Sequence, residues 1–321
     1  MNIASFGGEF RLINAVKRPA KNKKVIKAAG DDCAVIKNGK NYTVITKDIM
    51  VDGDHFDLRY ASARQTGIKA IESNVSDIAA MGARPLYALV GITLTHDTQA
   101  EWVKELYAGM YSRCAKHGID IIGGDTTHSS KIMISITVLG EVAPKRCIFR
   151  SGAKPGELIF STGKLGAAYT GYLLYTRGIK GHDYCKKQHL EPRCRLDAGT
   201  LLSRHAGAMI DVSDGLASEV KHIARESGCG AVLFKEKIPI DRRTVLACGE
   251  LGIDPTEPAL YGGEDYELVY TLHPKNIKKA IGYQVGVITE KMGVYLESRG
   301  VRALITRSGY DHFASSADKI T

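Results

Sequence analysis

The segment 74–82, Asn-Val-Ser-Asp-Ile-Ala-Ala-Met-Gly, constrains the fold of this chain more than any other stretch. Apolar residues recur at helical spacing before and within it, at Ile68, Ile71, Val75, Ile78 and Ala79. This period predicts a helix that packs one face inward and ends at Gly82. Asp77 then lies among small and apolar neighbours, where a carboxylate is costly to desolvate unless a positive group meets it. Taken alone, the residue could simply accept hydrogen bonds from nearby backbone.

Acidic residues beside glycine or serine recur elsewhere in the chain, at Asp31-Asp32, Asp48, Asp125, Asp211 with Asp214, and Glu264-Asp265. Most follow the end of a predicted strand or helix, a position that puts carboxylates at the rim of a cleft. If several converge, their mutual repulsion raises their pKa values unless cations lie among them. Oxygen ligands without a companion set of histidines and cysteines favour Mg²⁺ over Ca²⁺ and Zn²⁺.

Carboxylates that are spread over a whole chain are typical of sites where Mg²⁺ is shared with a phosphate group. Phosphoryl transfer depends on metals, an Arg or Lys and positioning more than on covalent help. Arg150 is the candidate cation, with an ordinary surface arginine as the alternative. A glycine-bearing turn at 162–166 precedes a predicted helix, but its spacing is not that of a P-loop, and tight strand–helix packing explains it better.

The sequence also predicts one strand and one helix cap next to these acids. A short strand at 119–122 should run into the glycine-rich segment Gly123-Gly124-Asp125. Ser213 or Asp214 should cap the helix that begins near residue 216, because both side chains can accept a hydrogen bond from a free backbone N–H group.

Length and composition indicate a globular chain of two domains, since 321 residues are 44% apolar and 25% charged. Pro144, Gly152 and Pro155 interrupt both periodicities, so we place the boundary between domains 1–143 and 144–321. No apolar run approaches the length of a membrane helix, and the first residues lack the layout of a signal peptide. These features favour a cytoplasmic protein without a membrane partner.

The seven scattered cysteines include no C-x-x-C pair, which favours free thiols over a disulfide framework or a zinc site. The net charge of +9 suits an anionic substrate or a nucleic acid. The densest basic run, 17–27, carries no interleaved aromatic residues of the kind that single-strand binders use. A solvated basic surface is therefore favoured over binding of nucleic acid.

Seven motifs occur in a fixed order along the chain. They are Gly30-Asp31-Asp32-Cys33-Ala34, Thr46-Lys47-Asp48, Gly53-Asp54-His55-Phe56, Asn74-Val75-Ser76-Asp77-Ile78-Ala79-Ala80-Met81-Gly82-Ala83, Gly123-Gly124-Asp125-Thr126, Asp211-Val212-Ser213-Asp214-Gly215-Leu216 and Gly263-Glu264-Asp265-Tyr266-Glu267-Leu268. In this order they resemble the thiamine-monophosphate kinase family, of the aminoimidazole ribonucleotide synthetase and selenophosphate synthetase superfamily. The resemblance runs from about Phe6 to Phe313 and rests mainly on the fourth and seventh motifs.

The resemblance implies a two-domain α+β fold, in which the N-terminal sheet forms a barrel with its mate in a homodimer and the C-terminal domain is an α/β sandwich. The implied reaction is ATP-dependent phosphorylation of thiamine monophosphate to thiamine diphosphate, by direct in-line transfer with several Mg²⁺ ions. The implied metal ligands are Asp32, Thr46, Asp48, Asp77, Asp125, Asp211 and Asp214. The implied ATP contacts are Gly124, Asp125, Arg150 and Ser213, and the implied contacts of the thiamine phosphate are His55, Glu264 and Tyr310. Asp214 and Arg150 are the implied catalytic residues.

The chain departs from the family at two of these motifs. Lys47 stands where the family often has a Thr or Ser that helps to hold a metal, and Tyr310 stands where a Trp is frequent. Two alternatives remain open. One is another ATP-dependent enzyme of the superfamily with a different acceptor, and the other is a non-catalytic sensor of nucleotide or thiamine phosphate. ADP production separates the sensor from the enzymes.

Overall fold

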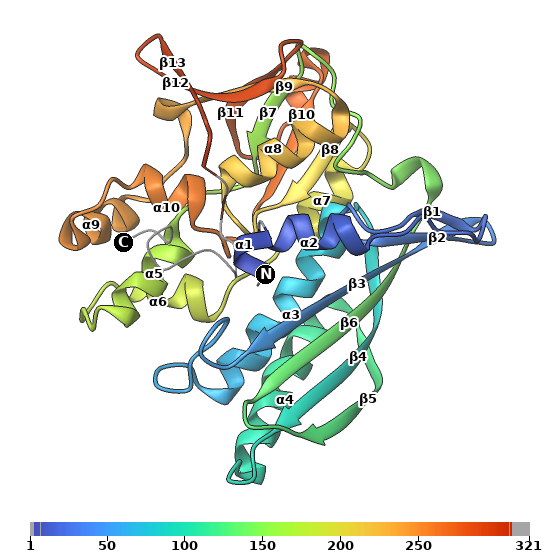
Figure 1. Cartoon of the computed structure of the whole chain (residues 1–321), viewed down its shortest axis with the longest axis vertical. Helices are drawn as coiled ribbons and strands as arrows, with labels where there is room; N and C mark the ends of the chain where they lie inside the picture. The colour runs from blue at the N-terminus through green and yellow to red at the C-terminus, as the bar shows by residue number, and fades with distance from the viewer. Residues whose placement is uncertain (1–2, 7, 308, 310–321) are drawn as a thin grey trace.

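A computed structural model describes residues 3–6, 8–307 and 309 of the chain. It contains two β-sheets, each packed against its own helices, in agreement with the α+β class expected from the sequence (Figure 1). All strands of the first sheet come from residues 25–142 and all strands of the second from residues 158–304. The domain boundary at 143/144 itself stays a prediction. No described helix is long and apolar enough to cross a membrane.

The N-terminal sheet has six strands in the order β1-β2-β3-β6-β4-β5. The strands are β1 (Val25–Lys27), β2 (Ala34–Asn38), β3 (Asn41–Val51), β4 (Arg84–Leu94), β5 (Asp120–His128) and β6 (Met133–Val142). Only β4 and β5 pair in parallel. Along β6 each buried residue alternates with a half-buried one, as expected for a sheet with one covered face. That face is covered by α3 (Ala63–Ala80) and α4 (Ala100–His117).

Helix α3 confirms the helix predicted through residue 80. Ser62 and Gln65 form a reciprocal capping box at its N-terminus, and the chain turns away at Gly82, which has a φ of 64°. The close packing of α3 on α4 requires Gly67, because a Cβ atom there would lie 2.0 Å from the carbonyl oxygen of Leu106. Most of α3 is buried, since its other faces meet β3, β6 and the C-terminal half of the chain.

The C-terminal sheet has seven strands in the order β13-β12-β9-β11-β7-β10-β8. The strands are β7 (Leu158–Ser161), β8 (Ala206–Asp211), β9 (Gly230–Phe234), β10 (Leu268–Leu272), β11 (Tyr283–Thr289), β12 (Gly293–Ser298) and β13 (Val301–Leu304). The remaining helices are α1 (Ile3–Phe6), α2 (Gly8–Val16), α5 (Ala167–Thr176), α6 (Asp183–Leu190), α7 (Leu196–Leu202), α8 (Leu216–Ser227), α9 (Arg242–Leu251) and α10 (Thr256–Tyr261). Short 3₁₀ turns occupy Pro144–Arg146, Lys235–Lys237 and Pro274–Lys279.

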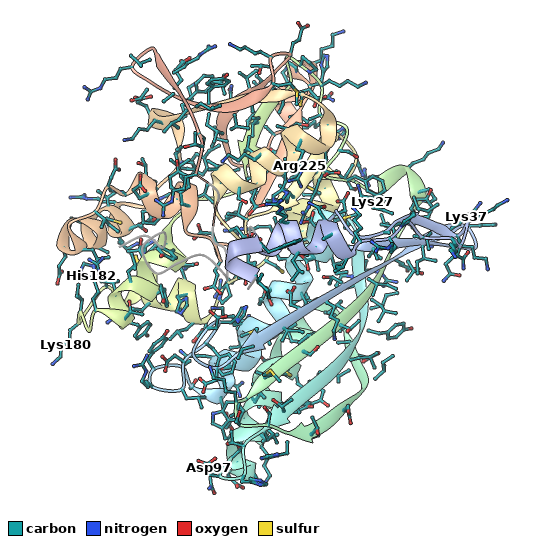
Figure 2. All side chains as sticks on the ribbon, in the orientation of Figure 1. Lys27, Lys37, Asp97, Lys180, His182 and Arg225 are labelled. Atoms are coloured by element: carbon teal, nitrogen blue, oxygen red, sulfur yellow. The ribbon has the colours of Figure 1, made fainter. Side chains whose placement is uncertain are left out.

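The two halves meet along α3, which packs against β8 and α7 of the C-terminal half. A second contact between the halves is an ion pair at β1, the edge strand of the N-terminal sheet. Lys27 Nζ of β1 lies 3.6 Å from a carboxylate oxygen of Glu226 on α8. Figure 2 shows Lys27 close to Arg225 at this junction, with Lys37 further out on the β2–β3 hairpin. Helix α3 is therefore the element that can bring residues of both halves to one place.

Two local predictions are wrong. The strand predicted at 119–122 does not end there, because β5 continues through Gly123-Gly124-Asp125 to His128 by parallel pairing with β4. Neither Ser213 nor Asp214 caps α8. Gly215 is the N-cap residue and its φ of 104° favours glycine there, while Glu219 Oε1 accepts a 2.9 Å hydrogen bond from the backbone N–H of Asp214.

Candidate active site

A cavity of about 1020 Å³ lies where the two halves meet, and residues of β3, α3 and the segment after β8 line it. Its lining is strongly acidic although the chain as a whole carries a charge of +9. Eight carboxylates face three cationic side chains, Lys47, Lys69 and Arg150. The acids are Asp31, Asp32, Asp48, Asp54, Asp77, Asp211, Asp214 and Glu264. An anionic substrate can enter such a cavity only together with cations.

Three carboxylates converge at the floor of the cavity. Asp32, Asp77 and Asp211 each place an oxygen within 4.8 Å of the other two, although they come from the loop before β2, the last turn of α3 and the end of β8. Two hydroxyl groups hold this arrangement. Thr46 Oγ1 donates a short hydrogen bond to Asp77, and Ser76 Oγ donates one of 2.7 Å to Asp211.

The pKa values of these acids are raised, because full ionisation of the buried cluster is unfavourable. Desolvation raises the pKa of Asp32, Asp48 and Asp211 to about 6 each, against an ordinary value of 3.8. Desolvation also raises the pKa of Asp77 well above that value, and the charges of Asp48, Asp211 and Asp32 raise it further. Oδ2 of Asp32 is buried with no hydrogen-bond partner among the described residues, whereas Oδ2 of Asp31 forms an ion pair with Lys27 Nζ at 3.3 Å. Hard oxygen donors of this kind fit Mg²⁺.

Arg150 supplies the nearest positive charge to this cluster. Its Nε and Nη2 atoms lie 3.0 and 2.5 Å from Asp32 Oδ1, and its backbone N–H donates a 3.1 Å hydrogen bond to Asp31. One guanidinium cannot neutralise the whole group of carboxylates. Lys47 also lines the cavity, and its Nζ donates a 2.5 Å hydrogen bond to Ser135 Oγ on the neighbouring strand β6.

A second polar group lies at the other end of the cavity. Glu264 pairs with Lys69 Nζ at 2.6 Å and is 3.0 Å from His189 Nδ1. Burial raises the pKa of Glu264, but the charge of Lys69 and the hydrogen bond from His189 outweigh this and lower it to about 2. His55 lines the same end and accepts a 3.2 Å hydrogen bond at Nδ1 from the backbone of Val51. Tyr169 and Tyr172 add aromatic surface.

Most of the residues named from the sequence meet in this cavity. Its lining includes Asp32, Thr46, Asp48, His55, Asp77, Arg150, Asp211, Ser213, Asp214 and Glu264. Gly124 and Asp125 lie elsewhere, on the edge strand β5, where both are exposed. Tyr310 lies outside the described residues.

Sequence reasoning missed several residues that shape the cavity. Lys69 and His189 flank Glu264, and Ser76 and Glu219 support Asp211 and Asp214 through hydrogen bonds. Lys69 could have been identified from the sequence. It directly follows Ile68 within the apolar pattern of the helix, and a buried lysine needs a partner of opposite charge. No comparable pattern surrounds His189.

Comparison with known proteins gives one consistent result. Residues 30–142 match the family described as AIR synthase related protein, N-terminal domain. The thiamine-monophosphate kinase of Aquifex aeolicus is 32% identical over 312 residues, which cover 95% of this chain and 98% of that protein. The thiamine-monophosphate kinase of Bacillus subtilis is also 32% identical, over 95% of this chain and 99% of its own length. The solved structure described as AaThiL complexed with AMPPCP and TMP superposes with a TM-score of 0.88 at 31% identity, over 97% of this chain and 99% of that one. The chain belongs to the thiamine-monophosphate kinase family.

Proposed function

We propose that this chain transfers the γ-phosphoryl group of ATP to thiamine monophosphate, giving thiamine diphosphate and ADP. The observation that carries the proposal is the convergence of Asp32, Asp77 and Asp211 beside Arg150 in a cavity lined by both halves of the chain. Membership of the family supplies the acceptor. The similar solved structure is described as a complex with AMPPCP and TMP, an ATP analogue and the acceptor.

Charge balance explains why the carboxylates fit this reaction. Both substrates carry phosphate groups, which the acids would repel if they met directly. Mg²⁺ held by Asp32, Asp77 and Asp211, with Asp48, Thr46 and Asp214 beside them, would supply the positive charge that joins phosphate oxygens to the protein. The buried oxygen Oδ2 of Asp32, which has no hydrogen-bond partner among the described residues, supports this fit.

The residues of the chain then position the reacting phosphate groups and neutralise their charge. The nucleophile is an oxygen of a phosphate group that is already anionic, so the reaction needs no strong general base. Arg150 lines the cavity and remains charged at every physiological pH, which suits it to the charge on the transferred phosphoryl group. Ser213 and Asp214 follow β8 and border the same space, where they would hold the nucleotide phosphates and a metal ion. In-line transfer requires the two phosphates to meet between these groups.

The other end of the cavity would hold the organic part of the acceptor. Thiamine carries a permanent positive charge on its thiazolium ring, and Glu264 stays ionised because Lys69 and His189 hold its pKa low. Tyr169 and Tyr172 offer ring faces to such a cation. His55 would contact the same substrate from the loop after β3.

We further infer a homodimer, in agreement with the expectation from the sequence. The sheet face opposite α3 and α4 carries large exposed apolar side chains, Ile49 at 51%, Tyr87 at 43% and Leu89 at 39%, next to Ile122 at 58% on the edge strand. Large apolar side chains exposed on an open sheet face are typical of a subunit interface. In a dimer closed along these sheets, Gly124 and Asp125 of one subunit would approach the cavity of the other.

The proposal is tested by incubating the purified chain with ATP, Mg²⁺ and thiamine monophosphate and separating the products. Thiamine diphosphate and ADP in equal amounts are expected. Unphosphorylated thiamine serves as the matched control acceptor and should give no diphosphate. Tight ATP binding without ADP would instead indicate a sensor, and ADP formed only with another phosphorylatable metabolite would indicate a different acceptor.

A further inference from the structure

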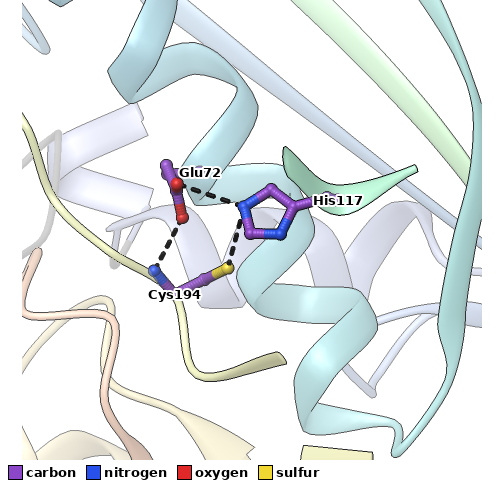
Figure 3. Close-up of side chains that lie close together, drawn as sticks. All are labelled: Glu72, His117 and Cys194. Atoms are coloured by element: carbon purple, nitrogen blue, oxygen red, sulfur yellow. Dashed lines mark hydrogen bonds and ion pairs between the residues drawn. The ribbon is translucent and has the colours of Figure 1, made fainter. Parts of the chain in front are cut away.

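A second cluster of ligand-forming side chains lies outside the cavity, on another face of α3. Glu72 of α3, His117 at the end of α4 and Cys194 between α6 and α7 place one donor atom each within 4.8 Å of the others. Figure 3 shows the three side chains pointing toward one another from separate segments. His117 Nε2 lies 3.1 Å from Glu72 Oε1 and 3.8 Å from Cys194 Sγ. None of the three lines the cavity.

Hydrogen bonds already join the three residues, since the backbone N–H of Cys194 also donates a 2.8 Å hydrogen bond to Glu72 Oε2. Both Glu72 and Cys194 face the same nitrogen of His117. If that nitrogen carries a proton, it donates to the carboxylate, and the thiol is left to donate to Glu72 rather than to the ring. If it carries a lone pair, it faces the lone pairs of the carboxylate. A metal ion accepts electron pairs from all three atoms at once.

The spacing of the atoms also fits a metal ion. Zinc binds nitrogen and oxygen at about 2.0–2.2 Å and sulfur at about 2.3 Å in a tetrahedron, which places its ligand atoms roughly 3.3–3.7 Å apart. The two separations at His117 Nε2, 3.1 and 3.8 Å, bracket that range. A set of imidazole, carboxylate and thiolate suits Zn²⁺, whereas Mg²⁺ prefers oxygen alone.

Two nearby cations oppose an ion at this position. Arg113 Nε lies 3.5 Å and Lys116 Nζ 3.7 Å from Glu72 Oε1. The structure gives neither cation a hydrogen bond to that oxygen, and Arg113 Nε is buried with no hydrogen-bond partner among the described residues. The side chain of Lys116 is 48% exposed and can turn into solvent. An ion-pair cluster without metal is therefore the competing account.

We propose that Glu72, His117 and Cys194 bind a zinc ion that fastens α3, α4 and the segment before α7 together. The site is buried, since Cys194 is 7% exposed and the His117 side chain 5%, and it joins three segments away from the cavity, so we assign the ion a structural role. Water would complete the tetrahedron. The sequence favoured free thiols over a zinc site because its cysteines are scattered, and here a single cysteine is joined by ligands from distant segments. The proposal is independent of the function proposed above.

The test uses Co²⁺ as a spectroscopic probe on the metal-free full-length chain, with excess Mg²⁺ present to occupy the carboxylate site. One equivalent of Co²⁺ per chain should produce a thiolate-to-cobalt absorption band. Cys194→Ser should abolish the band, and Cys248→Ser, a buried cysteine of α9, is the matched control that should keep it. His117→Gln should weaken Co²⁺ binding by more than about tenfold.

Thermal unfolding supplies a second readout. Zn²⁺ should raise the melting temperature of the wild type and of Cys248→Ser but not that of Cys194→Ser, because an ion that binds only the folded chain stabilises it. If Cys194→Ser does not fold, His117→Gln, which keeps the thiol, carries the test. Absence of a thiolate band in the wild type, or its survival in Cys194→Ser, would overturn the proposal and leave an ion-pair cluster.

Discussion

The hydroxyl of Ser76 on α3 donates a 2.7 Å hydrogen bond to Oδ2 of Asp211 at the end of β8, across 135 positions of sequence. It joins the two halves of the chain at the floor of the cavity. It also lowers the pKa of Asp211, which desolvation and neighbouring acids raise to about 6. The bond therefore holds the Asp211 carboxylate in place and favours its ionised form.

Ser76→Ala is expected to raise the Mg²⁺ concentration needed for half-maximal activity by about tenfold, equivalent to about 1.4 kcal/mol, because a hydrogen bond to a charged group is lost. The rate at saturating Mg²⁺ should change little. Titration of initial rates with Mg²⁺ measures both quantities. Ser112→Ala is the matched control, since Ser112 Oγ donates to the carbonyl of Gly109 within its own helix, α4, outside the cavity. Equal Mg²⁺ curves for the two variants would show that the Ser76 bond has no role in metal binding.

The acidic cluster predicts how the metal-free chain responds to pH. Asp32, Asp48 and Asp211 have pKa values of about 6 in the folded chain and ordinary values near 3.8 when unfolded. Between these values the folded chain holds protons that the unfolded chain has released. The free energy of unfolding should therefore fall as the pH rises from about 4 through about 6.

Asp77→Asn tests the same cluster by removing one charge. It should abolish product formation and raise the melting temperature of the metal-free chain at pH 8, because repulsion among the acids decreases. Mg²⁺ should stabilise the wild type more than this variant. Melting curves with chelator and with excess Mg²⁺ provide the comparison. Near-normal turnover, or a lower melting temperature without metal, would contradict the role given to Asp77.

Lys69 should control the pH range over which the acceptor binds. Without its charge, burial would raise the pKa of Glu264 from about 2 toward or above its ordinary 4.5. In Lys69→Met the KM for thiamine monophosphate, relative to the wild type at each pH, should therefore increase as the pH falls from 8 to 5. Lys164→Met removes a comparable ion pair, to Asp241, outside the cavity and is the matched control. A constant ratio of KM values across this range would exclude the effect.

The sequence predicted the members of the site better than their arrangement. Asp32, Asp77 and Asp211 were recognisable because acids beside small residues are unusual in apolar surroundings, and each sits where a local element begins or ends. His189, one partner of Glu264, was not recognisable, since it is 75 positions away and only the packing of α6 brings it close. At Gly123-Gly124-Asp125 the local sequence was instead misleading about the secondary structure. The strand predicted before this segment ends at residue 122, whereas parallel pairing with β4 carries β5 on through these residues to His128.

The position of Asp125 on the exposed edge strand leads to a test of the dimer. If Asp125 of one subunit completes the site of the other, Asp125→Asn and Asp77→Asn should each be inactive alone but complement one another when mixed. In a mixed dimer, one site then carries both substitutions and the other carries neither. Random exchange of equal amounts should restore about a quarter of the wild-type activity. The measurement is product formation after the two variants have been unfolded together and refolded, with each refolded alone as the control. No recovery, despite mixed dimers demonstrated by differential tagging, would place Asp125 outside the shared site.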